Sequence, residues 1–282
     1  MPSRNLGTSP NIGVNHIYLD PHDKVYIEDN SKLVVLSNNL TYEKNVSVNP
    51  QFNYICFDDD NHIYVMKDNF GQNRIEKTLC KFDLAGKLMC GFTSFSAGGY
   101  QKIGGLTLTS EHEYKPKAYY CIFSENIYYS YNFEYAISKF DLGGRLVAKF
   151  VVEEKPTKMT MEEKDHIIQR TKRQFKANVP LDIPMEFPSN RPYLSGLQCD
   201  EKGRIYAVRF KSILDNSKGF ILDIFANDGR LLYSSKVPYF PKIINKGTIY
   251  ALDTYRLDKD SDLSYRIIKL TVKNYNLMKS EI

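Results

Sequence analysis

The sequence predicts an all-β protein of the β-propeller type with one helical insertion, and three recurring features lead to this prediction. The first is a pair of short apolar runs joined through a glycine, at residues 81–92 (KFDLAGKLMCGF), 139–150 (KFDLGGRLVAKF) and 223–233 (DIFANDGRLLY). The second is a β-branched residue followed by tyrosine, at Val25-Tyr26, Ile63-Tyr64, Ile127-Tyr128, Ile205-Tyr206 and Ile249-Tyr250. The third is an acidic turn before most of these pairs, at residues 20–23, 58–61 and 200–203.

Each glycine-containing segment is predicted to be a β-hairpin. Asp83 and Asp141 are polar residues of the kind favoured at the entrance of a tight turn, and Gly86 and Gly144 provide the positive φ that such a turn needs. The flanking residues alternate with the two-residue period of half-buried strands. The hairpins therefore join neighbouring antiparallel strands.

The unit that recurs is strand, acidic turn, strand with the tyrosine, variable loop, strand, glycine turn, strand. Four antiparallel strands repeated at roughly forty residues or more are typical of a propeller blade, and blades stack because one blade cannot bury both faces. Five blades are readable, at residues 16–48, 54–95, 118–152, 196–237 and 243–273. Since this one pattern covers nearly the whole chain, residues 1–282 are predicted to form a single domain.

Apart from one insertion, residues 14–273 resemble the NHL-like and TolB-like six-bladed β-propellers of bacteria. The resemblance lies in the Ile-Tyr pairs and in the Lys-Phe-Asp-Leu-x-Gly-[Lys/Arg]-Leu segments. The resemblance implies six blades, and a function among scaffolds, lectin-like binders and a minority of enzymes. Since five blades are readable, three possibilities stay open. The chain is a fragment, the ring has five blades, or residues 96–118 and the termini complete a degenerate sixth.

Residues 153–192 interrupt the blades and are predicted to hold a helix followed by a proline-rich strap. Thr160 and Glu163 have the spacing of a capping box at the helix start, and the helix is expected to end near Asn178. A narrow apolar stripe is predicted at Met161, Ile167, Ile168 and Phe175.

The functional site is predicted at one mouth of the propeller. Loops at one mouth usually make the binding face, so residues 96–118, which have room for one or two extra strands, and residues 153–192 are expected to frame it. The binding residues predicted there are Lys164, Arg170, Arg173 and Tyr193.

Composition argues against several classes of partner. The formal net charge of +5 is modest and no basic run is dense, so no nucleic-acid partner is expected. No run of eighteen apolar residues is present, which predicts no transmembrane segment. We expect a monomer without a cofactor or a bound metal.

The sequence leaves the cellular compartment of the protein undecided. Residues 1–5 are not followed by the apolar segment of a secretory signal, which fits a cytoplasmic protein, or a periplasmic or extracellular one whose leader has been removed. Five scattered cysteines without a CxxC pair are expected to be buried thiols, with one disulfide of unknown pairing possible outside the cytoplasm.

Two functions are weighed. The favoured one is a non-catalytic binding or scaffold module that recognises a protein, peptide or glycan at the mouth. The alternative is a metal-dependent hydrolase resembling gluconolactonase-like propellers, which needs carboxylates and an amide around a metal; its candidates are Glu125, Asn126, Asp200 and Asp253. The repeated tyrosines are expected to pack between sheets, with their hydroxyls satisfied at blade edges.

Overall fold

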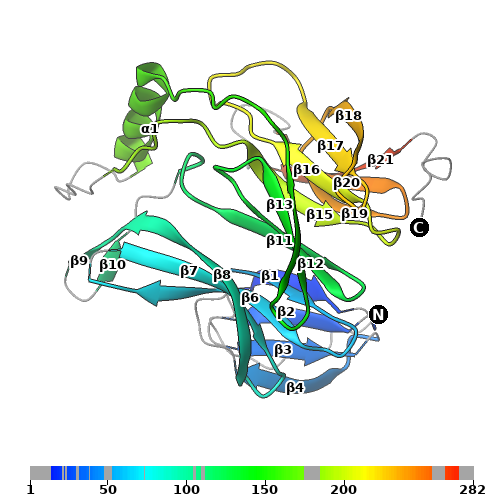
Figure 1. Ribbon diagram of the computed structural model, residues 1–282. Helices are drawn as coiled ribbons and strands as arrows, with labels where there is room; N and C mark the ends of the chain where they lie inside the picture. Colours follow the sequence, from blue (N-terminus) through cyan, green and yellow to red (C-terminus); the bar gives the residue numbers. More distant parts are fainter. Residues whose placement is uncertain are drawn as a thin grey trace. The chain divides into compact units, whose positions relative to one another are not determined.

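The structure is a computed structural model that describes residues 14–20, 22, 24–29, 32–37, 39–47, 53–72, 74–103, 106–108, 112–174, 185–255 and 264–272. Within these ranges it is all-β, with five β-propeller blades, named A to E, and one helix (Figure 1). That helix is too short and too polar to cross a membrane. The six blades implied by the resemblance are therefore wrong for this part of the chain, and the count of five read from the sequence is confirmed.

The chain divides into two compact units. Unit 1 comprises residues 1–69 and 77–94, and unit 2 comprises residues 70–76 and 95–282. The single domain expected from the repeat pattern stays a prediction.

Blades A and B are four-stranded antiparallel sheets in simple chain order. Blade A consists of β1 (Val14–Leu19), β2 (Val25–Asp29), β3 (Lys32–Leu36) and β4 (Tyr42–Ser47). Blade B consists of β5 (Asn53–Phe57), β6 (Ile63–Phe70), β7 (Arg74–Phe82) and β8 (Leu88–Gly99). Their facing side chains form one apolar core in unit 1, which includes Tyr26, Leu33, Phe57 and Val65.

Blades C, D and E belong to unit 2. Blade C consists of β11 (Ala118–Phe123), β12 (Asn126–Tyr131), β13 (Ala136–Asp141) and β14 (Leu146–Val151). Blade D consists of β15 (Leu194–Cys199), β16 (Ile205–Arg209), β17 (Phe220–Phe225) and β18 (Leu231–Val237). Blade E has three strands in the described residues, β19 (Pro241–Asn245), β20 (Thr248–Tyr255) and β21 (Ser264–Thr271). The extra strands expected in residues 96–118 are β9 (Gln101–Ile103) and β10 (Leu106–Leu108), a small hairpin.

The acidic turns and the repeated tyrosines form one motif. In three blades the first aspartate of the turn accepts a hydrogen bond from the tyrosine hydroxyl six residues later. The oxygen–oxygen distances are 3.1 Å for Tyr26 with Asp20, 2.7 Å for Tyr64 with Asp58 and 2.8 Å for Tyr206 with Asp200. The other carboxylate oxygen of each aspartate accepts backbone N–H groups two and four residues later. The tyrosine therefore supports the turn as well as the packing between sheets.

Hydrogen bonds within its turn stabilise Asp58 as a carboxylate. Burial alone would raise its pKa, but hydrogen bonds from Tyr64 and from His62 outweigh burial and hold the pKa of Asp58 below its usual value. Lys81, 3.3 Å from the same carboxylate, adds a nearby positive charge. Turn structure, as expected from the sequence, accounts for the 58–61 acidic run.

Blades C and E use a different turn at this place. Only two residues, Ser124 and Glu125, separate β11 from β12, and Lys246 and Gly247 separate β19 from β20. Ser124, Lys246 and Gly247 have positive φ, as such short hairpins require. Among the described residues, the motif of aspartate and tyrosine is therefore present in blades A, B and D.

The glycine hairpins predicted from the sequence are present. Gly86, Gly144 and Gly229 have φ of 81°, 94° and 90°. Asp83 and Asp141 accept two backbone N–H groups each in their turns, in the same manner as the aspartates above. In the third hairpin Ala226 takes the place of the aspartate; backbone hydrogen bonds of Ala226 close the turn, and Asp228 accepts the Arg230 N–H at 2.9 Å.

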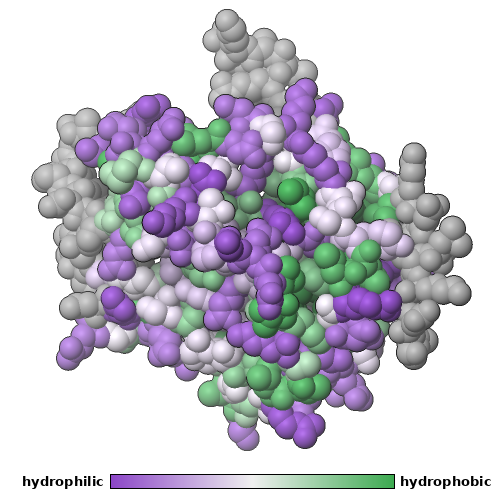
Figure 2. All heavy atoms as spheres, turned by 45° about the horizontal axis from the view of Figure 1, so that its top comes forward, coloured by the Kyte–Doolittle hydropathy of each residue, from purple (hydrophilic) through white to green (hydrophobic). Residues whose placement is uncertain are grey.

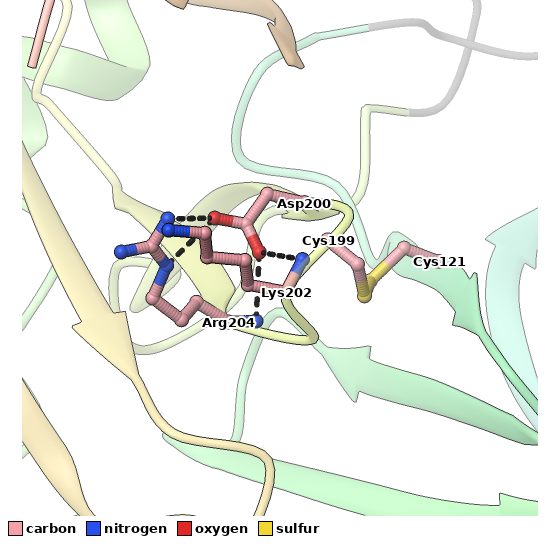
Figure 3. Close-up of a disulfide and its surroundings, with 5 residues drawn as sticks. All are labelled: Cys121, Cys199, Asp200, Lys202 and Arg204. Carbon is pink, nitrogen blue, oxygen red and sulfur yellow. Dashed lines mark hydrogen bonds and ion pairs between the residues drawn. A yellow bond between two sulfur atoms is a disulfide. The ribbon is translucent and has the colours of Figure 1, made fainter. Parts of the chain in front are cut away.

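A disulfide joins blades C and D. Cys121 on β11 and Cys199 on β15 have Cα atoms 5.8 Å apart and are separated by 78 residues in sequence (Figure 3). Cys199 directly precedes Asp200, whose turn also holds Arg204 in a buried ion pair. The expectation of buried thiols is therefore wrong for these two cysteines, while Cys56, Cys80 and Cys90 are not disulfide-bonded and Cys80 is buried.

The disulfide is expected to contribute about 2–4 kcal/mol to the free energy of unfolding, the typical range for a bridge that closes a long loop. The double variant Cys121→Ala/Cys199→Ala should lose this amount in a urea titration. Reductant should destabilise the wild type but not the variant. A titration that finds five reactive thiols in the unfolded, unreduced wild type would contradict the bridge.

Gly203 is expected to tolerate no side chain. Its φ is 73°, and an added Cβ would overlap the ring of Phe123 on blade C. Gly203→Ala should lower the free energy of unfolding by about 1–3 kcal/mol, because backbone strain and overpacking add. Gly91→Ala is the matched control, since its nearest neighbour would be Thr78 Cγ2 at 3.6 Å. Equal stability of the two variants in urea titrations would refute this packing.

Candidate functional site

The two ends of the insertion between blades C and D lie next to each other. Its two arms pair with each other, since Met159 N–H donates to the Ser189 carbonyl at 3.1 Å and Arg191 N–H donates to the Thr157 carbonyl at 2.7 Å. Lys158 and Asn190 form the β-bridge between these two bonds. The insertion is thus a loop closed at its base.

Helix α1 (Met161–Gln174) begins with the predicted capping box. Glu163 N–H donates to Thr160 Oγ1 at 3.2 Å, and Thr160 N–H donates to Glu163 Oε2 at 2.8 Å. The predicted stripe is partly wrong, because Met161 is 67% exposed. Ile167 is fully buried, together with Glu163. Phe175 lies outside the described residues, as does the predicted helix end near Asn178.

A small apolar core ties α1 to two other segments of unit 2. It contains Tyr114 from the segment before β11, Met159 and Ile167 from the insertion, and Phe210 and Ile213 from the loop between β16 and β17. The rings of Tyr114 and Phe210 meet edge to face with centroids 4.8 Å apart. Tyr114, from the 96–118 segment, therefore packs against the insertion, while the binding mouth that these segments were expected to frame stays a prediction.

Glu163 is the polar centre of this contact. Its carboxylate accepts hydrogen bonds from the Tyr114 hydroxyl at 2.5 Å and from the Ser212 hydroxyl, and it lies 2.9 Å from Arg191 Nε. Burial alone would raise its pKa, but the bonds from Ser212, the Thr160 amide, Tyr114 and Arg191 lower the pKa of Glu163 to about 2. The carboxylate is therefore ionised across the physiological range.

Topology places these segments at one end of the blades. In an antiparallel meander, the connection that enters the first strand and the loop between the second and third strands lie at the same end. Residues 112–117, the insertion and the β16–β17 loop all meet this condition, and Figure 1 shows α1 and the β16–β17 loop together above blades C and D. The Asp200 turn of blade D and the disulfide beside it lie toward the opposite end of the same blade.

A pocket of about 580 Å³ opens at this end, and we name it the strap pocket. Its walls come from the two arms of the insertion, at Glu154, Thr157 and residues 191–193, from several residues of blade D between Arg209 and Ile221, and from Lys236 on β18. This volume is within the range of about 300–1,000 Å³ usual for ligand sites. The face turned forward in Figure 2 is mostly hydrophilic, with small separate hydrophobic patches.

Arg209 lines the strap pocket and is held there by contacts with several side chains. Its Nε donates to Asp223 Oδ2 at 2.6 Å and its Nη1 donates to Glu154 Oε2 at 2.8 Å. Its guanidinium carbon lies 5.2 Å from the ring centroid of Tyr135, whose hydroxyl donates to Asp223. Burial and the Asp223 carboxylate raise the pKa of Tyr135, so this hydroxyl stays protonated. Arg209 is thereby held in one orientation between blades C and D.

Tyr193 is the predicted binding residue that lines the strap pocket. Its hydroxyl donates to the Glu154 carbonyl at 2.9 Å, and its ring stacks on Tyr135 with centroids 5.8 Å apart. Both contacts fix the ring against the base of the insertion.

The other three predicted binding residues lie on α1 and do not line the strap pocket. Arg170 makes a bidentate ion pair with Glu113, with both nitrogen–oxygen distances 2.6 Å. Arg170 and Arg173 border a second hollow of about 500 Å³ with Leu214. Lys164 is half-buried and borders neither hollow. The four residues therefore do not form one site.

The residues that the sequence interpretation missed are Arg209, Lys211 and Lys236. The available signal was the long polar loop at residues 210–219, where the other readable blades have shorter or less charged connections. Its charged residues follow no ligand-binding motif, and their association with Tyr193 depends on the packing of the insertion.

The candidates for a hydrolytic metal centre have other roles or locations. Asp200 is buried and accepts hydrogen bonds from Arg204 at 2.7 Å and Tyr206 at 2.8 Å. Glu125 and Asn126 lie at the β11–β12 turn, and the side chain of Asp253 lies outside the described part of the structure. The described residues contain no group of three or more histidine, cysteine, aspartate or glutamate side chains arranged to hold a metal.

No protein-family model matches the chain, and neither does any curated protein. Solved structures resemble it at low identity. Catalytically inactive virginiamycin B lyase from Staphylococcus aureus is 12% identical with a TM-score of 0.41, covering 91% of this chain and 70% of its own. A putative exported protein from Bacteroides fragilis is 9% identical with a TM-score of 0.47, covering 86% and 66%.

A member of the DUF4221 family from Bacteroides vulgatus is 11% identical with a TM-score of 0.44, covering 93% of this chain and 81% of its own. At such TM-scores the likeness carries no functional inference. The fold assignment rests on the five sheets of the chain itself.

Glu163 is expected to anchor the insertion. Glu163→Gln should lower the free energy of unfolding of unit 2 by about 1–3 kcal/mol, because Arg191 loses its ionic partner and the donors lose a charged acceptor. A depressed folded-state pKa gives stability that is present above the unfolded pKa of about 4.3 and lost as pH falls. The difference between wild type and variant should therefore shrink from pH 4.3 toward pH 2.

The matched control is Glu162→Gln, because Glu162 is the exposed neighbour on the same helix. Urea titrations at several pH values measure both variants. A Glu163→Gln difference that is constant with pH, or an equal loss in the control, would contradict the anchoring role.

Proposed function

We propose that this chain is a non-catalytic binding module that recognises a protein, peptide or glycan partner at the strap pocket. The observation that carries the proposal is the pocket's construction, in which two arms of an inserted loop and a long blade D loop line one open pocket beside the ends of the strands. Insertions that converge in this way usually serve recognition, since they add surface without altering the blade cores.

The polar groups of the pocket suit recognition. Arg209 and Arg191 are each fixed by carboxylates, and Tyr193 is fixed by a backbone carbonyl and a stacked ring. Donors held in place before binding lose less conformational entropy when the ligand arrives. Pro192, Phe210 and Phe220 supply apolar wall between these groups.

The hydrolase alternative receives less support. Asp200, one of its candidate ligands, forms a structural turn and a buried ion pair with Arg204. A carboxylate already engaged by a guanidinium and a tyrosine hydroxyl would have to break both contacts to reach a metal.

The Cys121–Cys199 disulfide supports an oxidising, extracytoplasmic location as part of this proposal, because such bonds persist mainly outside the cytosol. A relationship with bacterial NHL-like or TolB-like propellers, and a monomeric state, belong to the same proposal. The Ile-Tyr pairs and the glycine hairpins support the relationship with these propellers.

The proposal is tested by filling the pocket. Thr157 is exposed on the pocket wall, and its backbone bond to Arg191 does not depend on its side chain. Ligands selected on the wild type from peptide and glycan arrays should bind Thr157→Trp about tenfold or more weakly, a loss of about 1.4 kcal/mol. Surface plasmon resonance measures the affinities.

Lys155→Trp is the matched control, because Lys155 is exposed on the same arm but does not line the pocket. It should change each affinity less than about twofold. Ligands that bind Thr157→Trp as tightly as the wild type would overturn the proposed site, and turnover of a selected ligand into product would overturn the non-catalytic assignment.

A further inference from the structure

The positive charges of the strap pocket fall into two kinds. Arg191 faces Glu163 at 2.9 Å, and Arg209 faces Asp223 at 2.6 Å and Glu154 at 2.8 Å, so both guanidinium groups are neutralised by protein carboxylates. The two lysines of the pocket wall, Lys211 and Lys236, have a different environment.

Lys211 donates to the Ser217 carbonyl, and its ammonium lies 5.4 Å from the ring centroid of Phe220. An ammonium has three N–H donors, so this backbone bond leaves two for another acceptor. Lys236 crosses the same loop from β18, since its Cε would lie 3.3 Å from a Cβ at Gly219. Both side chains therefore converge on the loop at residues 217–220.

Neither lysine has a carboxylate within ion-pair distance among the residues that the structure describes. The carboxylate of the same loop, Asp215, accepts the Ser217 N–H at 2.8 Å. The Ser217 bonds lower the pKa of Asp215, with smaller contributions from Lys211 and Lys236. The rim at residues 211–219 thus has a local positive excess, and a concave wall concentrates its field on the cavity.

The wall next to this rim is apolar. Pro192, Leu214, Phe220 and Ile221 line the pocket beside the two lysines. A sugar presents many hydroxyls that need polar partners, whereas a peptide can place an apolar side chain against such a wall and an acidic one beside it. The two lysines beside this apolar wall therefore suit a peptide that carries both kinds of side chain.

We propose that the strap pocket takes an acidic peptide segment. Its carboxylate lies between Lys211 and Lys236, and a neighbouring apolar side chain lies against Phe220 and Leu214. This inference rests on the proposed function and names the ligand class of the same site. Lys211 and Lys236 are its specificity-determining residues.

The probes are two synthetic hexapeptide libraries, one alternating Asp or Glu with Leu or Phe, the other with Asn or Gln in place of the acids. Affinity is measured by fluorescence polarisation at fixed ionic strength. The acidic library should bind about tenfold more tightly than the amide library, and its advantage should fall between about 50 mM and about 200 mM NaCl.

The double variant Lys211→Met/Lys236→Met should remove the advantage of the acidic library and leave amide binding unchanged. Lys87→Met/Lys269→Met is the matched control, because it changes the net charge equally at two exposed lysines outside the pocket. It should keep the preference within about twofold. Thermal unfolding and near-ultraviolet circular dichroism check that each variant is folded.

Several outcomes would overturn the inference: no binding of the acidic library, equal binding of both libraries, or an unchanged preference in the Lys211→Met/Lys236→Met variant. Binding of oligogalacturonate with neither library binding would reassign the pocket to acidic glycans. Thr157→Trp separates the two proposals. If it weakens both libraries equally while the libraries do not differ, the pocket stands and the acidic preference fails; if it weakens neither, the proposed site itself fails.

Discussion

The aspartate that opens the first turn of blades A, B and D is the interaction on which their geometry depends. One carboxylate oxygen closes the turn through two backbone N–H groups, and the other receives the tyrosine hydroxyl from the next strand. A buried carboxylate needs this number of donors to remain ionised. The side chain therefore connects the local geometry of the turn to the packing between sheets.

Most of the fold could be predicted from the sequence because its information is local. Hairpin glycines such as Gly144, strand alternation and the capping box of Thr160 with Glu163 are set within a few residues. The disulfide could not be predicted, because the pairing of Cys121 with Cys199 depends on blades C and D being neighbours. The apolar stripe of α1 was misplaced since counting apolar residues overlooks Glu163, a charged side chain buried by its hydrogen bonds.

The candidate site was predicted only in outline. Tyr193, which follows the insertion, was among the predicted binding residues, whereas Arg209 and Lys236 lie on strands that resemble any other in sequence. They are candidates because their side chains line one pocket together with residues from separate segments of the chain. Charge alone directed attention to α1, where Arg170 is occupied by Glu113. Which charges are already paired is information that tertiary contacts provide and a single sequence does not.

The closed base of the insertion has an evolutionary consequence. Because Met159 and Arg191 pair with the opposite arm, the chain returns to the place where it left, and the distance between β14 and β15 is independent of what lies beyond the base. The residues outside this clamp can lengthen, shorten or be exchanged while the register of both blades is kept. The segment beyond the base can therefore change in evolution while the residues of the strap pocket, at the base and on blade D, stay in place.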